Sequence, residues 1–412
     1  MPKVLTPSIL LILFANVFLA DFSFAQTSTV PEKGIRDRFP TTAAITNARL
    51  VIEPGKVVEN GSLLIENGII QAVGEIDVPA HAQKIDLDGK VVYPALIEPR
   101  HEIEVSPKQS SSSHWNKNVR PEWSAANDWK NDENTNKSMR QAGFAIGLVV
   151  PKNGVIKGSS VAVSLGDGNS ADSIIRQEVA QHIRLTSSRS RDNYPGSPMG
   201  AVALARQTFY DANWYSQAWR AFNAGGNGPR PEANDALEKL SSALAKDELF
   251  VFDALDEQYA LRANRFAVEF GLNRVVLNGS GREYQRLDAI AEPGYTIIVP
   301  VNFPKPPNVA TPEAARDASL SELMHWRLAP ENPARLRDAG VNIVLTSHGL
   351  EDKSDFRKQL RTAVERGLDA DDALRACTIG PAKLLGIEAK ACLLYTSPSP
   401  RDQRGSRMPS SA

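Results

Sequence analysis

Charged and imidazole side chains gather near position 100, directly after a short apolar run. Residues 91–97 read VVYPALI, and Glu98, Arg100, His101, Glu102 and Glu104 follow. The apolar run with its proline predicts a buried strand that begins at a sheet edge. Carboxylates, a guanidinium and an imidazole at a strand end can bind a metal or an anion, or exchange protons. Ion pairing among these charges at a solvated strand end is the alternative interpretation, because structural ion pairs also cluster.

The elements that would position these side chains are strands alternating with helices. Strand-like runs cover 144–150, 161–165, 250–254, 274–277, 295–301 and 341–346. Apolar residues at helical spacing predict helices over 256–270, which Gly271 would end, and over 354–367. Such alternation is typical of parallel βα units. We therefore expect an α/β fold close to a (β/α)8 barrel, irregular between Gly166 and Lys246, with its active site at the carboxyl ends of the strands.

A smaller β-rich unit precedes this body. Between positions 45 and 85, runs at 48–52, 62–65 and 69–73 alternate with turns, and Glu66-Asn67-Gly68 is typical of a tight hairpin. The pattern indicates half of a small β-sandwich.

Two stretches carry a family resemblance. NARLVIEPGKVVENGSLLIENGIIQAVG and IDLDGKVVYPALIE resemble the opening of the amidohydrolase superfamily. The resemblance implies a TIM-like barrel with a composite sandwich, and a zinc site that begins with an Asp-x-His-x-His motif. Here the positions of the motif read Glu98, Arg100 and Glu102, so both histidines are missing. His101 falls between them, on the opposite face of a strand.

The remaining ligand positions are also changed. Asp253 in VFDAL and Asn278 in VVLNGS stand where the resemblance implies histidines, and Ser347 replaces the aspartate that would accept a proton from metal-bound water. His348 follows Ser347. Because the unperturbed pKa of an imidazole lies near neutrality, His348 could act as a general base. A histidine that only forms hydrogen bonds at a strand end is the alternative interpretation. Glu102 and Asp253 could still offer oxygen ligands to Mg²⁺ or Ca²⁺. We predict no metal for this chain, against divalent zinc in the family.

Other candidates in the sequence carry less weight. Lys157 in GVIKG invites comparison with a carboxylated bridging lysine, but its segment matches an earlier strand, and we expect a surface charge. His81, His114, His182 and His325 are expected in sandwich, loop or helix contexts without ligand spacing. The polar segment 106–139 holds Trp115, Trp123 and Trp129, which could stack on sugars or rings but more commonly anchor a loop.

Further text resembles one exported branch of the superfamily. Proteins of this branch, whose barrel lacks its metal ligands, have segments similar to NYPGSPMGAVALARQTFYDANWY, HWNKNVRPEWSA and GLVVPKNGVIKGSSVAVSL. The resemblance implies that a second amidohydrolase-like half with intact ligands often follows. We therefore expect a first half that is incomplete at the C-terminus, with sandwich strands that lack their C-terminal partners.

The two ends of the chain differ from its body. Residues 1–25 combine Lys3, an apolar stretch over 9–20 and Ser23-Phe24-Ala25, which predicts a bacterial signal peptide and a periplasmic or secreted protein without a stable membrane span. Residues 391–412 include SPSPRDQRGSRMPSSA, which resembles translated sequencing adapter. The predicted organisation is signal peptide 1–25, linker 26–44, sandwich part 45–97, truncated barrel 98–390 and adapter-like tail 391–412.

Composition narrows the possible functions. The 412 residues carry a net charge of −1, which gives no footprint for nucleic acid, and two cysteines exclude a disulfide framework. One hypothesis is an exported amidohydrolase that cleaves cyclic amide or dipeptide-like C–N bonds with a divalent metal. The alternative is a non-catalytic half that binds a small molecule or packs on a catalytic half. A metal-independent lyase or isomerase that uses Arg100, His101 and His348 is the third.

Overall fold

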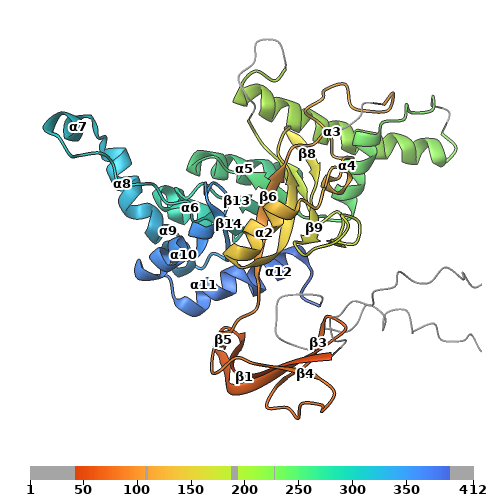
Figure 1. Cartoon of the computed structure of the whole chain (residues 1–412). Coiled ribbons are helices and arrows are strands. Elements are labelled where there is room, and N and C mark those ends of the chain that lie inside the picture. Colours follow the sequence, from red (N-terminus) through yellow and green to blue (C-terminus); the bar gives the residue numbers. More distant parts are fainter. Residues whose placement is uncertain (1–41, 107–109, 187–193, 227, 390–412) are drawn as a thin grey trace, which may run out of the picture.

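The computed structural model describes residues 42–106, 110–186, 194–226 and 228–389. The expected signal peptide, most of the linker and the adapter-like tail lie outside these residues. The described chain forms a small N-terminal sheet and a larger α/β body, joined where the chain passes from β5 to β6 (Figure 1). None of the described helices combines the length and apolar character needed to cross a membrane.

The small unit is a five-stranded sheet. Its strands are β1 (Thr42–Glu53), β2 (Lys56–Glu66), β3 (Ile69–Gly74), β4 (Gln83–Asp86) and β5 (Val91–Val92), ordered β3-β2-β1-β4 with β5 also paired to β1. Asn67 and Gly68 both adopt positive φ, which confirms the tight hairpin between β2 and β3. The strands predicted in this part are confirmed, with β1 and β2 longer than expected.

The body is built on two further sheets. One has the order β10-β9-β7-β6 and contains β6 (Leu96–Ile103), β7 (Phe144–Pro151), β9 (Val161–Ser164) and β10 (Ile174–Arg176). The other has the order β15-β14-β13-β12-β11-β8 and contains β8 (Ile156–Ser159), β11 (Gln181–Ile183), β12 (Phe250–Asp253), β13 (Val275–Asn278), β14 (Thr296–Pro300) and β15 (Ile343–Thr346). From β11 to β15 all neighbouring strands are parallel, as the alternation with helices predicted.

The first strand of the body differs from its prediction. Residues 91–97 do not form one strand, because β5 ends at Val92 and β6 begins at Leu96, with Pro94 between them. Val91 is 41% exposed and pairs with β1 of the small sheet. Most of the charged cluster consequently lies within β6 itself, and only Glu104 follows the end of the strand.

Helices lie around these sheets, except that those within residues 312–328 extend away from the body (Figure 1). They are α2 (Glu133–Ala142), α3 (Pro198–Asn223), α4 (Asp235–Ala245), α5 (Glu257–Phe270), α6 (Leu287–Ala291), α7 (Pro312–Asp317), α8 (Leu320–Leu328), α9 (Asn332–Asp338), α10 (Phe356–Glu365), α11 (Ala370–Cys377) and α12 (Ile379–Leu385), with single 3-10 turns η1 (Ala125–Asn127), η2 (Glu283–Arg286), η3 (Ala329–Glu331) and η4 (Lys353–Asp355). Asp256 caps the start of α5 and Gly271 ends it in the left-handed conformation, as predicted. The segment expected to be irregular contains the 26-residue α3 and α4.

Side chains alternate between two cores along the parallel strands. In β12, Phe250 and Phe252 pack outward against the helices, whereas Val251 belongs to an inner cluster that also contains Val276 and Val344. Because strand side chains alternate in direction, the residue two positions after each inner residue faces the same interior. This register determines which polar side chains meet there.

Candidate functional site

Three polar side chains enter the interior because each lies two residues after an inner core residue. Asp253 follows Val251, Asn278 follows Val276 and Thr346 follows Val344. All three are at most 3% exposed. A buried polar group is tolerated only with partners, so these positions predict a connected polar network.

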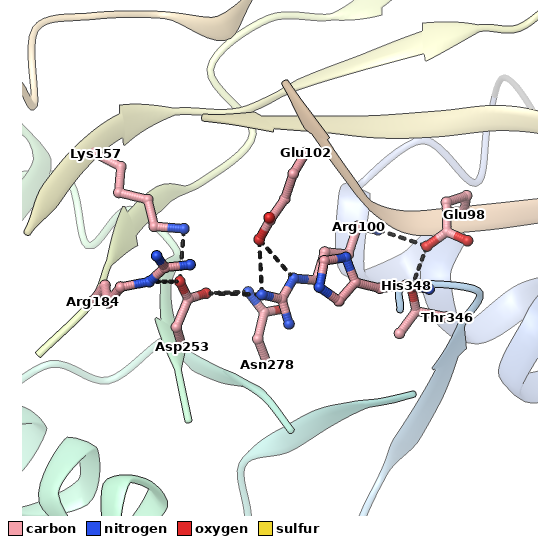
Figure 2. Close-up of polar contacts among 9 residues, drawn as sticks. All are labelled: Glu98, Arg100, Glu102, Lys157, Arg184, Asp253, Asn278, Thr346 and His348. Atoms are coloured by element: carbon pink, nitrogen blue, oxygen red, sulfur yellow. Dashed lines mark hydrogen bonds and ion pairs between the residues drawn. The ribbon is translucent and has the colours of Figure 1, made fainter. Parts of the chain in front are cut away.

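Asp253 is the centre of that network (Figure 2). Lys157 Nζ lies 2.7 Å from its Oδ2, and Arg184 Nε donates to the same oxygen at 2.9 Å. Asn278 Nδ2 donates to Oδ1 at 2.8 Å, and Arg100 lies 3.9 Å from Oδ1. Both oxygens of the Asp253 carboxylate are therefore engaged by donors.

Arg100 links Asp253 to a partly buried carboxylate, that of Glu102. Its Nη2 and Nε donate to Glu102 Oε1 at 2.8 and 3.1 Å. Arg100 and Glu102 both come from β6 and are separated by two residues, so the strand period places them on one face. Of the candidates from the sequence, Arg100, Glu102, Asp253 and Asn278 thus meet in one network.

The charges in this network shift its proton equilibria. Burial raises the pKa of Asp253, but the nearby charges of Lys157, Arg100 and Arg184 outweigh it and hold that pKa well below its ordinary value. Burial also raises the pKa of Glu102, but the charges of Arg100 and Lys157 outweigh it, so the pKa of Glu102 is lowered. Burial lowers the pKa of the Lys157 ammonium, against the attraction of Asp253. Both carboxyl groups are consequently ionised at neutral pH.

Lys157 and His182 correct two expectations. Lys157 was expected to be a surface charge, yet its side chain is fully buried in β8 and pairs with Asp253. His182 was expected in a sandwich, loop or helix context, yet it lies in strand β11 of the body and is 1% exposed. Neither of its ring nitrogens has a hydrogen-bond partner among the described residues. Burial lowers the pKa of His182 to about 3, so the ring is neutral.

Arg184 is a member of the network that the sequence did not indicate. It directly follows β11 and reaches Asp253 from there, with its side chain 25% exposed. A signal for Lys157 was present, since it stands between Ile156 and Gly158 in a run whose neighbours are mostly apolar. A lysine inside such a run has to face the interior or break the strand.

The two histidines near the predicted motif differ in position. His101 meets Trp129 at a ring-centroid distance of 6.2 Å, on the side of the outer core and away from Asp253, in agreement with its expected direction. His348 follows Ser347 after β15, where burial and the charge of Arg100 lower its pKa to about 4. At that pKa His348 is a weak base, which disfavours the general-base interpretation that the sequence left open beside simple hydrogen bonding.

Glu98 and Ser347 connect β6 with β15 rather than entering the network around Asp253. Ser347 N donates to Glu98 Oε2 at 2.8 Å, and the Thr346 hydroxyl donates to Oε1 (Figure 2). The backbone N of Arg100 also donates to Oε1, at 3.0 Å. Burial raises the pKa of Glu98, although these hydrogen bonds oppose the shift. Ser347 thus contributes its backbone to a contact between the two sheets.

These side chains do not fit a divalent cation. The carboxylates of Asp253 and Glu102 already form ion pairs with Lys157, Arg184 and Arg100. Among the ion pairs and hydrogen bonds of the described residues, no imidazole adjoins either carboxylate as a further metal ligand. Two unit charges about 4 Å apart repel by roughly 4 kcal/mol at an effective dielectric constant of 20, so each cation disfavours a metal here. Within residues 42–389, apart from the gaps noted above, no group of three His, Cys, Asp or Glu side chains is arranged to hold a metal.

Comparisons with solved structures identify the fold. An amidohydrolase from Thermotoga maritima MSB8 matches with a TM-score of 0.68 at 20% identity, over 86% of this chain and 91% of the other. A putative prolidase from Bifidobacterium longum matches with a TM-score of 0.48 at 17% identity, over 88% of each chain. No protein-family model matches the sequence, and no curated protein matches it. The first likeness, together with the α/β architecture, shows that the chain shares the fold of the Thermotoga maritima amidohydrolase.

Proposed function

We propose that this chain is an exported amidohydrolase-like protein that binds a small molecule and does not perform metal-dependent hydrolysis. One observation carries the proposal: the amino group of the buried Lys157 lies 2.7 Å from the carboxylate of Asp253. Asp253 occupies the position where the family resemblance implies a metal-binding histidine. A hydrolase that cleaves C–N bonds is the activity that fold likeness alone favours. Fold does not determine function, whereas the donor set of the site limits it directly.

The charge of the network favours an anionic ligand. Three basic side chains, those of Arg100, Lys157 and Arg184, face two carboxylates, those of Glu102 and Asp253. Arg184 is the most exposed member, at 25% of its side chain, so it can contact a ligand that enters from solvent. A guanidinium binds a carboxylate through paired hydrogen bonds, which makes a small carboxylate such as an N-acyl amino acid or a dipeptide the favoured class.

Ligand binding is tested by calorimetry with N-acetyl amino acids and dipeptides. Arg184→Ala should weaken binding by at least about tenfold, since hydrogen bonds to charged groups contribute roughly 1.5–3 kcal/mol. Arg206→Ala is a matched control, because Arg206 forms an exposed ion pair with Glu269 on the outer helices. Equal loss in both variants, or binding unaffected by Arg184→Ala, would refute the anion site.

The competing hydrolase is tested by elemental analysis and by amide hydrolysis with and without added zinc. We expect well under one transition metal per chain after mild dialysis, and no metal-dependent turnover of the same N-acyl and dipeptide substrates. One tightly held metal that is lost together with activity in Glu102→Ala and Asp253→Ala would restore the enzymatic interpretation.

Three broader features belong to the same proposal. We infer that β6 and β15 complete a barrel through the Glu98 contact, that the small sheet is one layer of a composite sandwich, and that a second amidohydrolase-like half is the partner. Residues 1–25 support export to the periplasm or the exterior. Fusing residues 1–30 to alkaline phosphatase without its own leader tests export, since the reporter is active only after translocation and disulfide formation.

A further inference from the structure

A cavity lies apart from the network, between the segment after β6 and helix α3. It has a volume of about 440 Å³ and is lined by His114, Trp115, Tyr194, Ala203, Leu204, Gln207, Thr208 and Asp211. That volume falls within the range of small-molecule sites. None of the residues of the Asp253 network lines it.

Two aromatic rings form an exposed wall of this cavity. Trp115 is 71% exposed and Tyr194 is 51% exposed, and their rings stack with centroids 6.2 Å apart at an interplanar angle of 21°. The other tryptophans of this segment behave differently: Trp129 is buried and donates to Ser173, and Trp123 donates to Asp128. Only Trp115 of the three is therefore available to a ligand, because the other two anchor the segment.

The wall is held in place by buried polar groups. The Asn116 side chain is 5% exposed, and its Nδ2 donates to the Tyr194 carbonyl at 2.9 Å. The backbone N of Asn116 donates to His114 Nδ1 at 3.0 Å, which leaves the proton of the neutral ring on Nε2. Tyr194 Oη donates to the Gly200 carbonyl at 3.2 Å. The two aromatic segments are thus tied together before any ligand arrives.

The floor of the cavity is one stripe of α3 with a carboxylate. Ala203, Gln207 and Asp211 recur every four residues and share a face of the helix. Gln207 Nε2 donates to Asp211 Oδ1 at 2.7 Å. The charge of Asp211 acts on the His114 ring, which also lines the cavity, and opposes the lowering of the His114 pKa by burial. No lysine or arginine lines the cavity. The cavity therefore combines one negative charge with two exposed aromatic faces.

We propose that this cavity binds an organic cation of the alkylammonium class. Aromatic faces attract cations through the ring quadrupole, and quaternary ammonium groups are recognised by aromatic walls of this kind. Asp211 supplies the compensating charge, and Leu204 supplies an apolar surface for alkyl groups. A neutral ligand would use the aromatic wall but would leave the carboxylate without a partner.

Choline and its neutral isostere 3,3-dimethyl-1-butanol test the proposal with the full chain. Calorimetry and tryptophan fluorescence should show that choline binds at least about fivefold more tightly, a ratio that corresponds to roughly 1 kcal/mol of cation–π and charge attraction. Trp115→Ala and Asp211→Asn should each weaken choline binding by a similar factor, and Trp115→Phe should retain part of it. Added salt should weaken binding to the native chain more than to Asp211→Asn.

Trp214→Ala is the matched control, because Trp214 is a 63% exposed tryptophan on α3 that does not line the cavity. It should leave choline binding unchanged, and circular dichroism should show native helix content in all four variants. Equal affinity for choline and the isostere would overturn the proposal in favour of a neutral ligand. Absence of choline binding, or equal loss in Trp214→Ala, would overturn the site itself.

Discussion

At the scale of single residues, the site consists of basic side chains around one buried carboxylate. Asp253 ends β12, and Lys157, Arg184 and Arg100 surround it. Buried ion pairs of this kind contribute little net stability compared with apolar packing, but removing one partner exposes the others to an uncompensated desolvation penalty. The network is therefore sensitive to single substitutions.

Asp253→Asn should destabilise the chain by about 3–5 kcal/mol, because it leaves the buried Lys157 and the partly exposed Arg184 without their counter-charge. Adding Lys157→Met should recover part of that loss by removing one of the stranded charges. Urea unfolding measures both, and Glu269→Gln, which breaks an exposed pair, should cost less than about 1 kcal/mol. A loss for Asp253→Asn no larger than that of the control would contradict the network.

The residues of this site were only partly predictable from sequence. Asp253 and Asn278 each end a short apolar strand, so the period of two placed them correctly at one interior. Lys157 and Arg184 come from the part of the chain where β8 runs antiparallel to β11, a pairing that local pattern does not encode. Ion-pair partners across such non-local strands depend on tertiary register, which the sequence alone left open.

At the scale of elements, two contacts hold the strands that carry the site. Gly158, next to Lys157 in β8, has φ of +107°, and its neighbours Ile156 and Ser159 bond the backbone of residues 120–123. A Cβ at Gly158 would clash with the Trp123 carbonyl oxygen and lie 2.9 Å from the Arg120 carbonyl oxygen. Only glycine allows this approach of two backbones.

Gly158→Ala should consequently cost about 3 kcal/mol or more, since backbone strain and a clash with main-chain atoms act together. Gly68→Ala provides the comparison, because Gly68 also has positive φ but nothing lies within 4 Å of its added Cβ. Gly68→Ala should lower the free energy of unfolding by roughly 1 kcal/mol, which is the cost of a positive φ alone. Thermal and urea unfolding measure the difference, and equal losses would show that the contact with residues 120–123 is unimportant.

The contact between β6 and β15 should make stability depend on pH. Glu98 has a raised pKa in the folded state because of burial, so its contribution is fully present below the ordinary carboxyl pKa and is lost as pH rises through the folded-state pKa. Glu98→Gln removes this titration. The stability of the native chain relative to Glu98→Gln should therefore decrease from about pH 4.5 upward. Urea titrations at several pH values measure this trend, and a rising difference would contradict it.

At the scale of the whole molecule, the small sheet and the α/β body have separate cores. Ala48, Leu50 and Ile52 form the buried centre of the sheet, whereas two clusters that share no residue with them fill the body. The alternation of strands and helices predicted the body well because parallel βα units have a strong local signature. The second layer expected for the sandwich stays a prediction, because its strands would come from distant sequence.

The small sheet should open more readily than the body, because its buried apolar cluster is small and its strand β4 is exposed along its whole length. Hydrogen exchange followed by mass spectrometry should show amides of β1, β2 and β3 exchanging at least about tenfold faster than those of β12 and β13, which belong to the buried parallel sheet. Limited proteolysis should cut first within residues 45–97. Equal protection of both regions would mean that contacts beyond its own core already stabilise the small sheet. That result would contradict the expectation that the sheet lacks its partner strands.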